Sequence, residues 1–173
     1  MKIAILVAMD KELALLLHQI KDGHKEIIDG IEVTVGHIGR HEVLAAKCGI
    51  GKVNAALKTL GIIRAYHPEL VINSGVAGGA GTGMKVGDLL VADRAVYHDV
   101  WCGPGTKTGQ ADESPLFFET YAPVLEIARG HLENGNTAVG LICTGDRFIS
   151  ENEEVRTIRR NFPDVKAVDM ESA

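Results

Sequence analysis

Two acidic residues and a methionine follow a short apolar run near the end of the 173-residue sequence, as Asp169-Met170-Glu171. The apolar run, Val165 to Val168, has the length of a buried strand. The triplet therefore places a carboxylate at the C-terminal end of a strand, where α/β proteins bind their ligands. We interpret these three residues as part of a substrate-binding site.

Glu12 is a second acidic residue whose position could serve chemistry. It follows a strand-like run, Ile3 to Ala8, and lies near the start of an amphipathic stretch, Lys11 to Ile20. An acidic residue at a helix start often only caps the helix or interacts with its dipole. From this segment alone, that structural role and the role of a general base both stay open.

Glycines gather between Gly75 and Gly83, after the apolar run Leu70 to Ile72. They do not form G-x-G-x-x-G in register with a following amphipathic helix, so a dinucleotide site is not expected. Gly49-Ile50-Gly51-Lys52 lacks the first glycine and the serine or threonine of a P-loop. The glycine-rich segment predicts either a tight turn or a close approach of a ligand to the backbone.

Strand-like and helix-like segments alternate along the chain and must position these residues. The expected strands are Ile3–Ala8, a hairpin of Ile31–Val35 and Glu42–Cys48, then Leu70–Ile72, Asp88–Ala92, Ala138–Cys143 and Val165–Val168. The expected helices are Lys11–Ile20, Val53–Tyr66, Phe117–Glu133 and Glu151–Asn161, with a turn at Asn134-Gly135 and an irregular segment over residues 97–115. This order predicts an α/β fold with a mixed, centrally parallel sheet flanked by helices, in a single domain spanning residues 1–173.

Composition excludes several classes of protein. The formal net charge of -5 and the scattered basic residues argue against a partner that is a nucleic acid. No apolar run approaches the roughly 20 residues that span a bilayer, so we expect no membrane association and a cytoplasmic protein. Cys48, Cys102 and Cys143 are widely spaced; we expect packing residues rather than disulfides or a metal site. No cofactor is expected.

Eight short segments together resemble a known family. They are Ala8-Met9-x-x-Glu12, Gly49–Ala56, Asn73–Gly79, Lys85–Asp88, Tyr97–Asp99, Gly145–Ile149, Asn161–Pro163 and Val168–Glu171. In this order the series resembles the 5′-methylthioadenosine/S-adenosylhomocysteine nucleosidases of the purine nucleoside phosphorylase/uridine phosphorylase superfamily. The resemblance covers essentially the whole sequence and implies a nucleoside-phosphorylase-like fold and a homodimer.

The reaction implied by this resemblance is hydrolysis of an N-ribosidic bond with release of adenine. It needs a base for water, a grip on the ribose and an acid for the purine. Glu12 matches the family's water-activating glutamate. Glu171 matches the carboxylate that accepts hydrogen bonds from the ribose hydroxyls, and Met170 matches the thioether that packs on the sugar.

The resemblance also implies residues for the base and for the wall of the site. Phe148 matches the ring that stacks on adenine, and Ile149 matches the backbone that reads the purine edge. Ala77 and Gly78 match the loop beside the ribose. His98 and Asp99 are expected to form a structural pair that borders the long irregular segment.

Two positions separate hydrolases from phosphorylases within this resemblance. Related phosphorylases carry an arginine at the position of Asn73 and a serine at that of Val76, since phosphate needs charged and hydroxyl donors. Neither is present here, which favours water as the nucleophile. Many nucleosidases also carry serine at the position of Val76, so one polar contact near the ribose differs.

The sequence leaves the substituent at the 5′ position and the completeness of the chain open. Gly103 to Gln110 contains none of the aromatic residues with which relatives cover the 5′ group. Relatives continue past the Met-Glu motif to an aspartate that protonates the purine, so we expect the fold to lack its C-terminal strand and helices and the 173-residue chain to be impaired. The alternatives are another purine nucleosidase or a phosphorylase, and a non-catalytic nucleoside-binding or dimerisation module.

Overall fold

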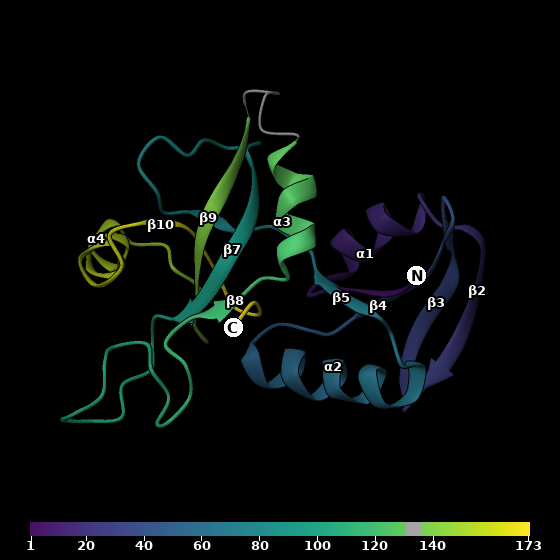
Figure 1. Cartoon of the computed structure of the whole chain (residues 1–173), viewed down its shortest axis with the longest axis horizontal. Coiled ribbons are helices and arrows are strands. Elements are labelled where there is room, and N and C mark those ends of the chain that lie inside the picture. Colours follow the sequence, from purple (N-terminus) through teal and green to yellow (C-terminus); the bar gives the residue numbers. More distant parts are fainter. Residues whose placement is uncertain (131–135) are drawn as a thin grey trace. The chain divides into compact units, whose positions relative to one another are not determined.

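The computed structural model of this protein describes residues 1–130 and 136–173. The chain forms two compact units, Met1–Val76 and Ala77–Ala173. Each unit contains a five-stranded sheet with both parallel and antiparallel pairs (Figure 1). The predicted α/β class with mixed, centrally parallel strands and flanking helices is confirmed, and the strands are divided between two sheets.

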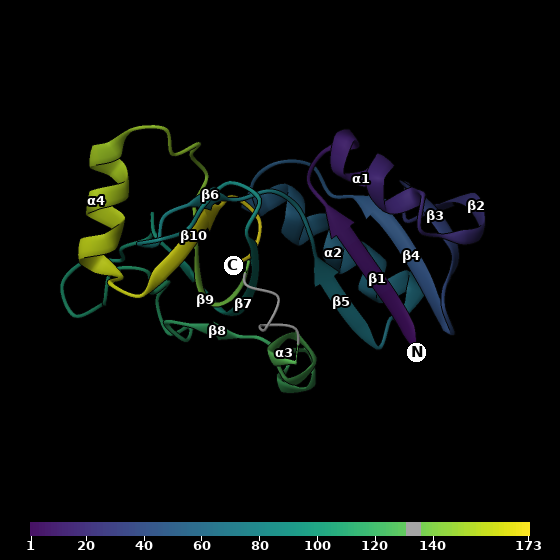
Figure 2. The same ribbon diagram turned by 90° about the horizontal axis from the view of Figure 1, so that it is seen from above.

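The first unit contains five strands and two helices. They are β1 (Lys2–Val7), α1 (Asp10–Leu17), β2 (Lys21–Ile28), β3 (Ile31–Ile38), β4 (His41–Lys47), α2 (Lys52–Tyr66) and β5 (Leu70–Asn73). The strands lie in the order β2-β3-β4-β1-β5, with β4, β1 and β5 parallel and the hairpins antiparallel. The predicted hairpin of β3 and β4 is confirmed. Figures 1 and 2 show α1 and α2 on opposite faces of this sheet.

Helix α2 covers the main core of the first unit. Its buried residues Ala55, Ile62 and Tyr66 recur at helical spacing. Ile62 and Tyr66 join a cluster with alternate residues of the strands, which point to one face of the sheet. The cluster contains Ala4, Leu6, Val33, Val35, Leu44, Ala46, Ile62 and Tyr66. The helix ends at His67, in a left-handed conformation directly before Pro68, which disfavours further helix.

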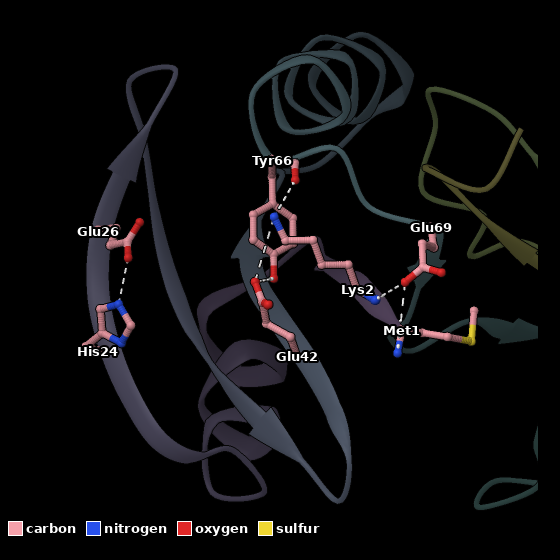
Figure 3. Close-up of polar contacts among 7 residues, drawn as sticks. All are labelled: Met1, Lys2, His24, Glu26, Glu42, Tyr66 and Glu69. Atoms are coloured by element: carbon pink, nitrogen blue, oxygen red, sulfur yellow. Dashed lines mark hydrogen bonds and ion pairs between the residues drawn. The ribbon is translucent and has the colours of Figure 1, made fainter.

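A polar cluster fixes the start of β1 to the end of α2 (Figure 3). The ammonium group of Lys2 donates to the Tyr66 carbonyl at 2.9 Å and lies 4.1 Å from the centre of the Tyr66 ring. The Tyr66 hydroxyl donates to Glu42 at 2.9 Å. Burial, followed by the neighbouring Glu42 carboxylate, raises the pKa of the Tyr66 hydroxyl above its ordinary value. These contacts lie at the amino end of β1, the end opposite to Glu12.

Gly61 of α2 packs directly against the turn between β2 and β3. A β-carbon at position 61 would lie 2.5 Å from Oδ2 of Asp29. Glycine to alanine normally stabilises a helix interior by about 1 kcal/mol. We expect Gly61→Ala instead to lower the free energy of unfolding by about 1–3 kcal/mol, because Asp29 must move. Urea denaturation measures this change.

The control for this prediction removes the opposing side chain. Asp29 has a positive φ of 48°, which suits glycine. The double variant Asp29→Gly/Gly61→Ala should recover most of the stability lost by Gly61→Ala alone. A single Gly61→Ala variant as stable as the natural protein would contradict the prediction.

Among its described residues, the second unit contains five strands and two helices. They are β6 (Gly78–Gly79), β7 (Leu89–Tyr97), β8 (Phe118–Glu119), α3 (Ala122–Arg129), β9 (Thr137–Thr144), α4 (Asn152–Asn161) and β10 (Val165–Asp169). The strand order is β6-β10-β9-β7-β8, with β10, β9 and β7 parallel. Ile158 of helix α4 and Phe162, which directly follows the helix, pack in a cluster with Val96, Leu141 and Cys143. Figure 2 shows α4 beside β10.

Several elements differ from the sequence-based expectation. Strand β2 was not predicted because almost all of its residues are exposed, so it shows no apolar pattern. The helix predicted from Phe117 begins at Ala122 instead, because Phe118 pairs with β7 and Pro123 lies in the first helical turn. Residues 131–135, which include the predicted end of this helix and the turn at Asn134-Gly135, lie outside the described residues.

Candidate active site

Glu12 lies at the carboxyl edge of the first unit's sheet, in the first turn of α1. Its Oε2 accepts the backbone N–H groups of Ala8 at 3.0 Å and Met9 at 2.9 Å. Its Oε1 accepts the backbone N–H of Val76 at 2.9 Å. Glu12 therefore caps α1, as an acidic residue at a helix start often does, and also joins the helix start to the segment after β5.

The segment after β5 comes close to Glu12 because it continues the parallel pairing with β1. Ser74 donates its backbone N–H to the Leu6 carbonyl at 2.9 Å. A β-carbon on the next residue, Gly75, would lie 2.8 Å from Oε1 of Glu12. Glycine at this position therefore allows the backbone to reach the carboxylate. The bond from Val76 fixes the direction of the carboxylate from the opposite side.

The carboxyl ends of three parallel strands coincide in the second unit. Tyr97 of β7 pairs with Thr144 of β9, which in turn pairs with Asp169 of β10. The residues that follow these strands, including Asp146 and Glu171, therefore start from one edge of the sheet. Such an edge is where open α/β sheets bind ligands.

Asp169 is hydrogen-bonded within its own unit. Oδ1 accepts the hydroxyl of the fully buried Thr144 at 2.6 Å. Oδ2 accepts the Ser172 hydroxyl at 2.5 Å and, at the longer distance of 3.4 Å, the backbone N–H of Glu171. The Asp169 carbonyl accepts the N–H of Gly145 at 3.1 Å. Met170 and Glu171 are half-buried in the turn that these bonds define.

Phe148 and Ile149 lie in the connection between β9 and α4. Phe148 is 80% exposed, whereas Ile149 packs against the core of the second unit. Arg147 pairs with Glu154 of α4 at 2.7 Å, which holds the connection. The hydrogen bond from the backbone N–H of Glu151 is the main cause that lowers the pKa of the Glu154 carboxyl; desolvation opposes it, and the N–H of Ser150 and the charge of Arg147 lower the pKa further.

Ala77 and Gly78 are exposed at the start of the second unit. Gly78 pairs with Val168 in the short strand β6, and a β-carbon on it would lie 3.0 Å from the Val168 side chain. A side chain larger than hydrogen therefore fits poorly at position 78. The backbone at Ala77 and Gly78 thus runs beside the strand that carries Asp169.

His98 and Asp99 follow β7 at the same edge of the second sheet. Asp99 accepts the backbone N–H of Asp146 at 2.8 Å, and His98 donates its backbone N–H to the Thr144 carbonyl at 2.9 Å. A β-carbon on Gly145 would lie 2.5 Å from the His98 ring. These contacts tie the residues after β7 to the residues after β9.

The cysteines and the described acidic residues offer no further chemical centre. Cys48 and Cys143 are buried as expected, but Cys102 is exposed, which corrects the expectation that all three are packing residues. Burial raises the pKa of the Cys143 thiol to about 12, with smaller effects of Asp164 and Asp169, so it stays protonated at neutral pH. Within the described ranges, no group of three or more His, Cys, Asp or Glu could hold a metal ion.

The sequence analysis missed three groups that the structure places beside the candidate residues. These are the Val76 amide, the Thr144 hydroxyl and the Ser172 hydroxyl. Thr144 gave no signal in the sequence, since its strand was expected to end at Cys143 and its pairing with Asp169 follows only from the structure. The amide carries no side-chain signal, because any residue except proline supplies it.

Comparisons with known proteins place these residues in a family. The model of the phosphorylase superfamily matches residues 2–173. The 5′-methylthioadenosine/S-adenosylhomocysteine nucleosidase of Hydrogenovibrio crunogenus is 40% identical over an alignment that covers this whole chain and 76% of that protein. The chain belongs to the nucleosidases of the phosphorylase superfamily. This confirms the resemblance identified from the eight sequence segments.

Solved structures of nucleosidases agree with this assignment. The S-adenosylhomocysteine nucleosidase of Streptococcus pyogenes, in complex with 5-methylthiotubericidin, is 34% identical with a TM-score of 0.95 and covers 99% of this chain and 74% of that chain. The Neisseria meningitidis nucleosidase, in complex with methylthio-immucillin-A, is 36% identical with a TM-score of 0.93 and covers 99% of this chain and 76% of that chain.

Along the described part of the chain, the helices are too short or too polar to cross a membrane.

Proposed function

We propose that this protein hydrolyses the N-ribosidic bond of 5′-methylthioadenosine and S-adenosylhomocysteine and releases adenine. The observation that carries the proposal is the Glu12 carboxylate, which three backbone N–H groups hold at the carboxyl edge of a sheet. A general base must be fixed in direction to take a proton from water. The nucleosidases among the relatives support the choice of reaction.

Water, rather than phosphate, is the proposed nucleophile. The segment after β5 presents the exposed, apolar Val76 side chain, while the Val76 amide donates to Glu12. A phosphate would need charged and hydroxyl donors, and the side chains of Asn73 and Val76 provide neither a positive charge nor a hydroxyl. Water needs only a base, which Glu12 supplies.

Residues of the second unit are proposed to bind the nucleoside. Glu171 would accept the ribose hydroxyls, with Met170 on the sugar and Ala77 and Gly78 beside it. The exposed Phe148 ring would stack on adenine, since an exposed aromatic face on a fixed connection can take up a base. The backbone of Ile149, whose side chain is anchored in the core, would read the purine edge.

An adenine-release assay tests the proposal. 5′-methylthioadenosine would be supplied with and without phosphate to the 173-residue chain and to a version extended by the C-terminal segment of the Hydrogenovibrio crunogenus relative. We expect the extended version to release adenine without phosphate. Release that requires phosphate, or none from either version, would overturn the proposal.

A homodimer is proposed as the assembly of this protein. Helix α2 exposes an apolar stripe of Val53, Leu57, Leu60 and Ile63, of which Leu57 is 65% exposed. The stripe follows helical spacing on the side away from the buried residues. Exposed apolar patches of this kind mark interaction surfaces.

The cytoplasmic location expected from the sequence stays a prediction.

A single substitution in this stripe tests the homodimer. We expect Leu57→Glu to reduce the molar mass in light scattering from that of a dimer to that of a monomer, because it places a charge in an apolar interface. The matched control is Leu15→Glu, at a leucine of α1 that is 73% exposed, and it should leave the dimer intact. A natural protein that is monomeric, or a dimeric Leu57→Glu variant, would contradict the proposal.

A further inference from the structure

Asp169 differs in its surroundings from the other residues proposed to bind the nucleoside. Each of its carboxylate oxygens already accepts a hydroxyl at short distance, from Thr144 at 2.6 Å and from Ser172 at 2.5 Å. Bonds from neutral donors to a carboxylate are among the stronger hydrogen bonds in proteins. A ribose hydroxyl would have to compete with these donors.

The two hydroxyl donors come from different parts of the second unit, one from a strand and one from the turn that carries Met170 and Glu171. Thr144 is 0% exposed at the end of β9, so it is a fixed point of the sheet. Ser172 directly follows Glu171, and the N–H of Glu171 also points to Asp169. The carboxylate of Asp169 thus connects the rigid strand β9 to the turn that carries Met170 and Glu171.

We propose that Asp169 is a positioning residue, which holds the Met170-Glu171 turn through Thr144 and Ser172 and does not itself contact the ribose. This inference rests on the proposed function and replaces the direct substrate contact expected for Asp169 from the sequence. Groups that bind a substrate need support from neighbouring side chains, since a displacement of about 1 Å can cost a factor of about 10² in rate.

The nature of the contacts distinguishes positioning from direct binding. In an Asp169→Asn variant, the side-chain oxygen could take the place of Oδ2 and accept the Ser172 hydroxyl and the Glu171 N–H, while the amide group donates to the Thr144 hydroxyl, which also accepts. We therefore expect Asp169→Asn to keep kcat/KM within about threefold, while Asp169→Ala lowers it by about 10-fold to 100-fold. A residue that bound the ribose through its negative charge would lose as much with asparagine as with alanine.

The donors provide an independent test. Thr144→Val keeps the shape of the buried side chain but removes the hydroxyl, and Ser172→Ala removes the other donor at a half-buried position. We expect each to lower kcat/KM by about 3-fold to 30-fold, mainly through KM, with Thr144→Ser restoring the natural value. In the Asp169→Ala background the same substitutions should have little further effect, because the partners act as a unit.

The experiment measures adenine release and, separately, the Kd of methylthio-immucillin-A by calorimetry, for all variants and the natural protein. Circular dichroism confirms that each variant is folded. Equal losses in Asp169→Asn and Asp169→Ala, with natural values in Thr144→Val and Ser172→Ala, would overturn the positioning role while leaving the proposed function intact. A natural protein, with or without the added C-terminal segment, that neither releases adenine nor binds the analogue would instead overturn the proposed function.

Discussion

Replacing Glu12 with glutamine lowers the rate of adenine release by about 10²- to 10⁴-fold, the contribution of a general base. The substitution removes the proton acceptor and also disturbs its anchoring. A glutamine has one oxygen, whereas the carboxylate accepts N–H groups on both sides, from Ala8 and Met9 at Oε2 and from Val76 at Oε1. On one side, the glutamine NH2 group would therefore face a backbone N–H group, and neither can accept a hydrogen bond from the other. The rate is measured in whichever version of the protein turns over.

The control for this prediction lies on the same helix. Asp10 is 81% exposed and pairs with Lys47 at 2.7 Å, and surface ion pairs contribute little. Asp10→Asn should therefore release adenine within about twofold of the natural rate. A folded Glu12→Gln variant with a natural rate would show that Glu12 only caps α1 and that the base lies elsewhere.

Substituting Gly75 with alanine should lower the rate by about 100-fold without touching a titratable group. The new β-carbon would lie 2.8 Å from Oε1 of Glu12, closer than real contacts allow, so the carboxylate must turn away. A displacement of about 1 Å costs on the order of 10²-fold when a catalytic group must be aligned. The expected signature is a fall in kcat with a smaller change in KM.

Two variants check the cause of this loss. Gly130→Ala is the matched control, because its nearest neighbour would lie at an ordinary 3.4 Å and its φ is -64°. The double variant Gly75→Ala/Glu12→Asp should be no slower than Glu12→Asp alone, since the shorter side chain no longer meets the β-carbon. A Gly75→Ala variant with the natural rate would show that Glu12 need not hold its observed direction.

The sequence predicted the apolar elements well and the polar ones poorly. The buried residues of β1 and α2 follow the spacing of a strand and a helix, so both were predicted within a few residues. Strand β2 exposes nearly every side chain and is held by backbone bonds to β3. Such an edge strand leaves no pattern in residue types.

The candidate site shows the same division. Glu12, Phe148 and Glu171 were chosen as candidates through the resemblance, and their roles stay predictions. One partner of each of Glu12 and Asp169 was not predicted because it comes from far along the chain: Val76 is 64 positions from Glu12, and Thr144 is 25 from Asp169. Strand pairing brings them together, and only the structure gives its register.

Because backbone groups anchor Glu12, the direction of its carboxylate does not depend on the side chain at position 76. All three donors are main-chain N–H groups, so any residue except proline at positions 8, 9 and 76 preserves the anchor. The side chain at position 76 is 74% exposed and can vary while the carboxylate keeps its direction. The residue at position 76 can therefore change without disturbing the carboxylate that we propose as the base.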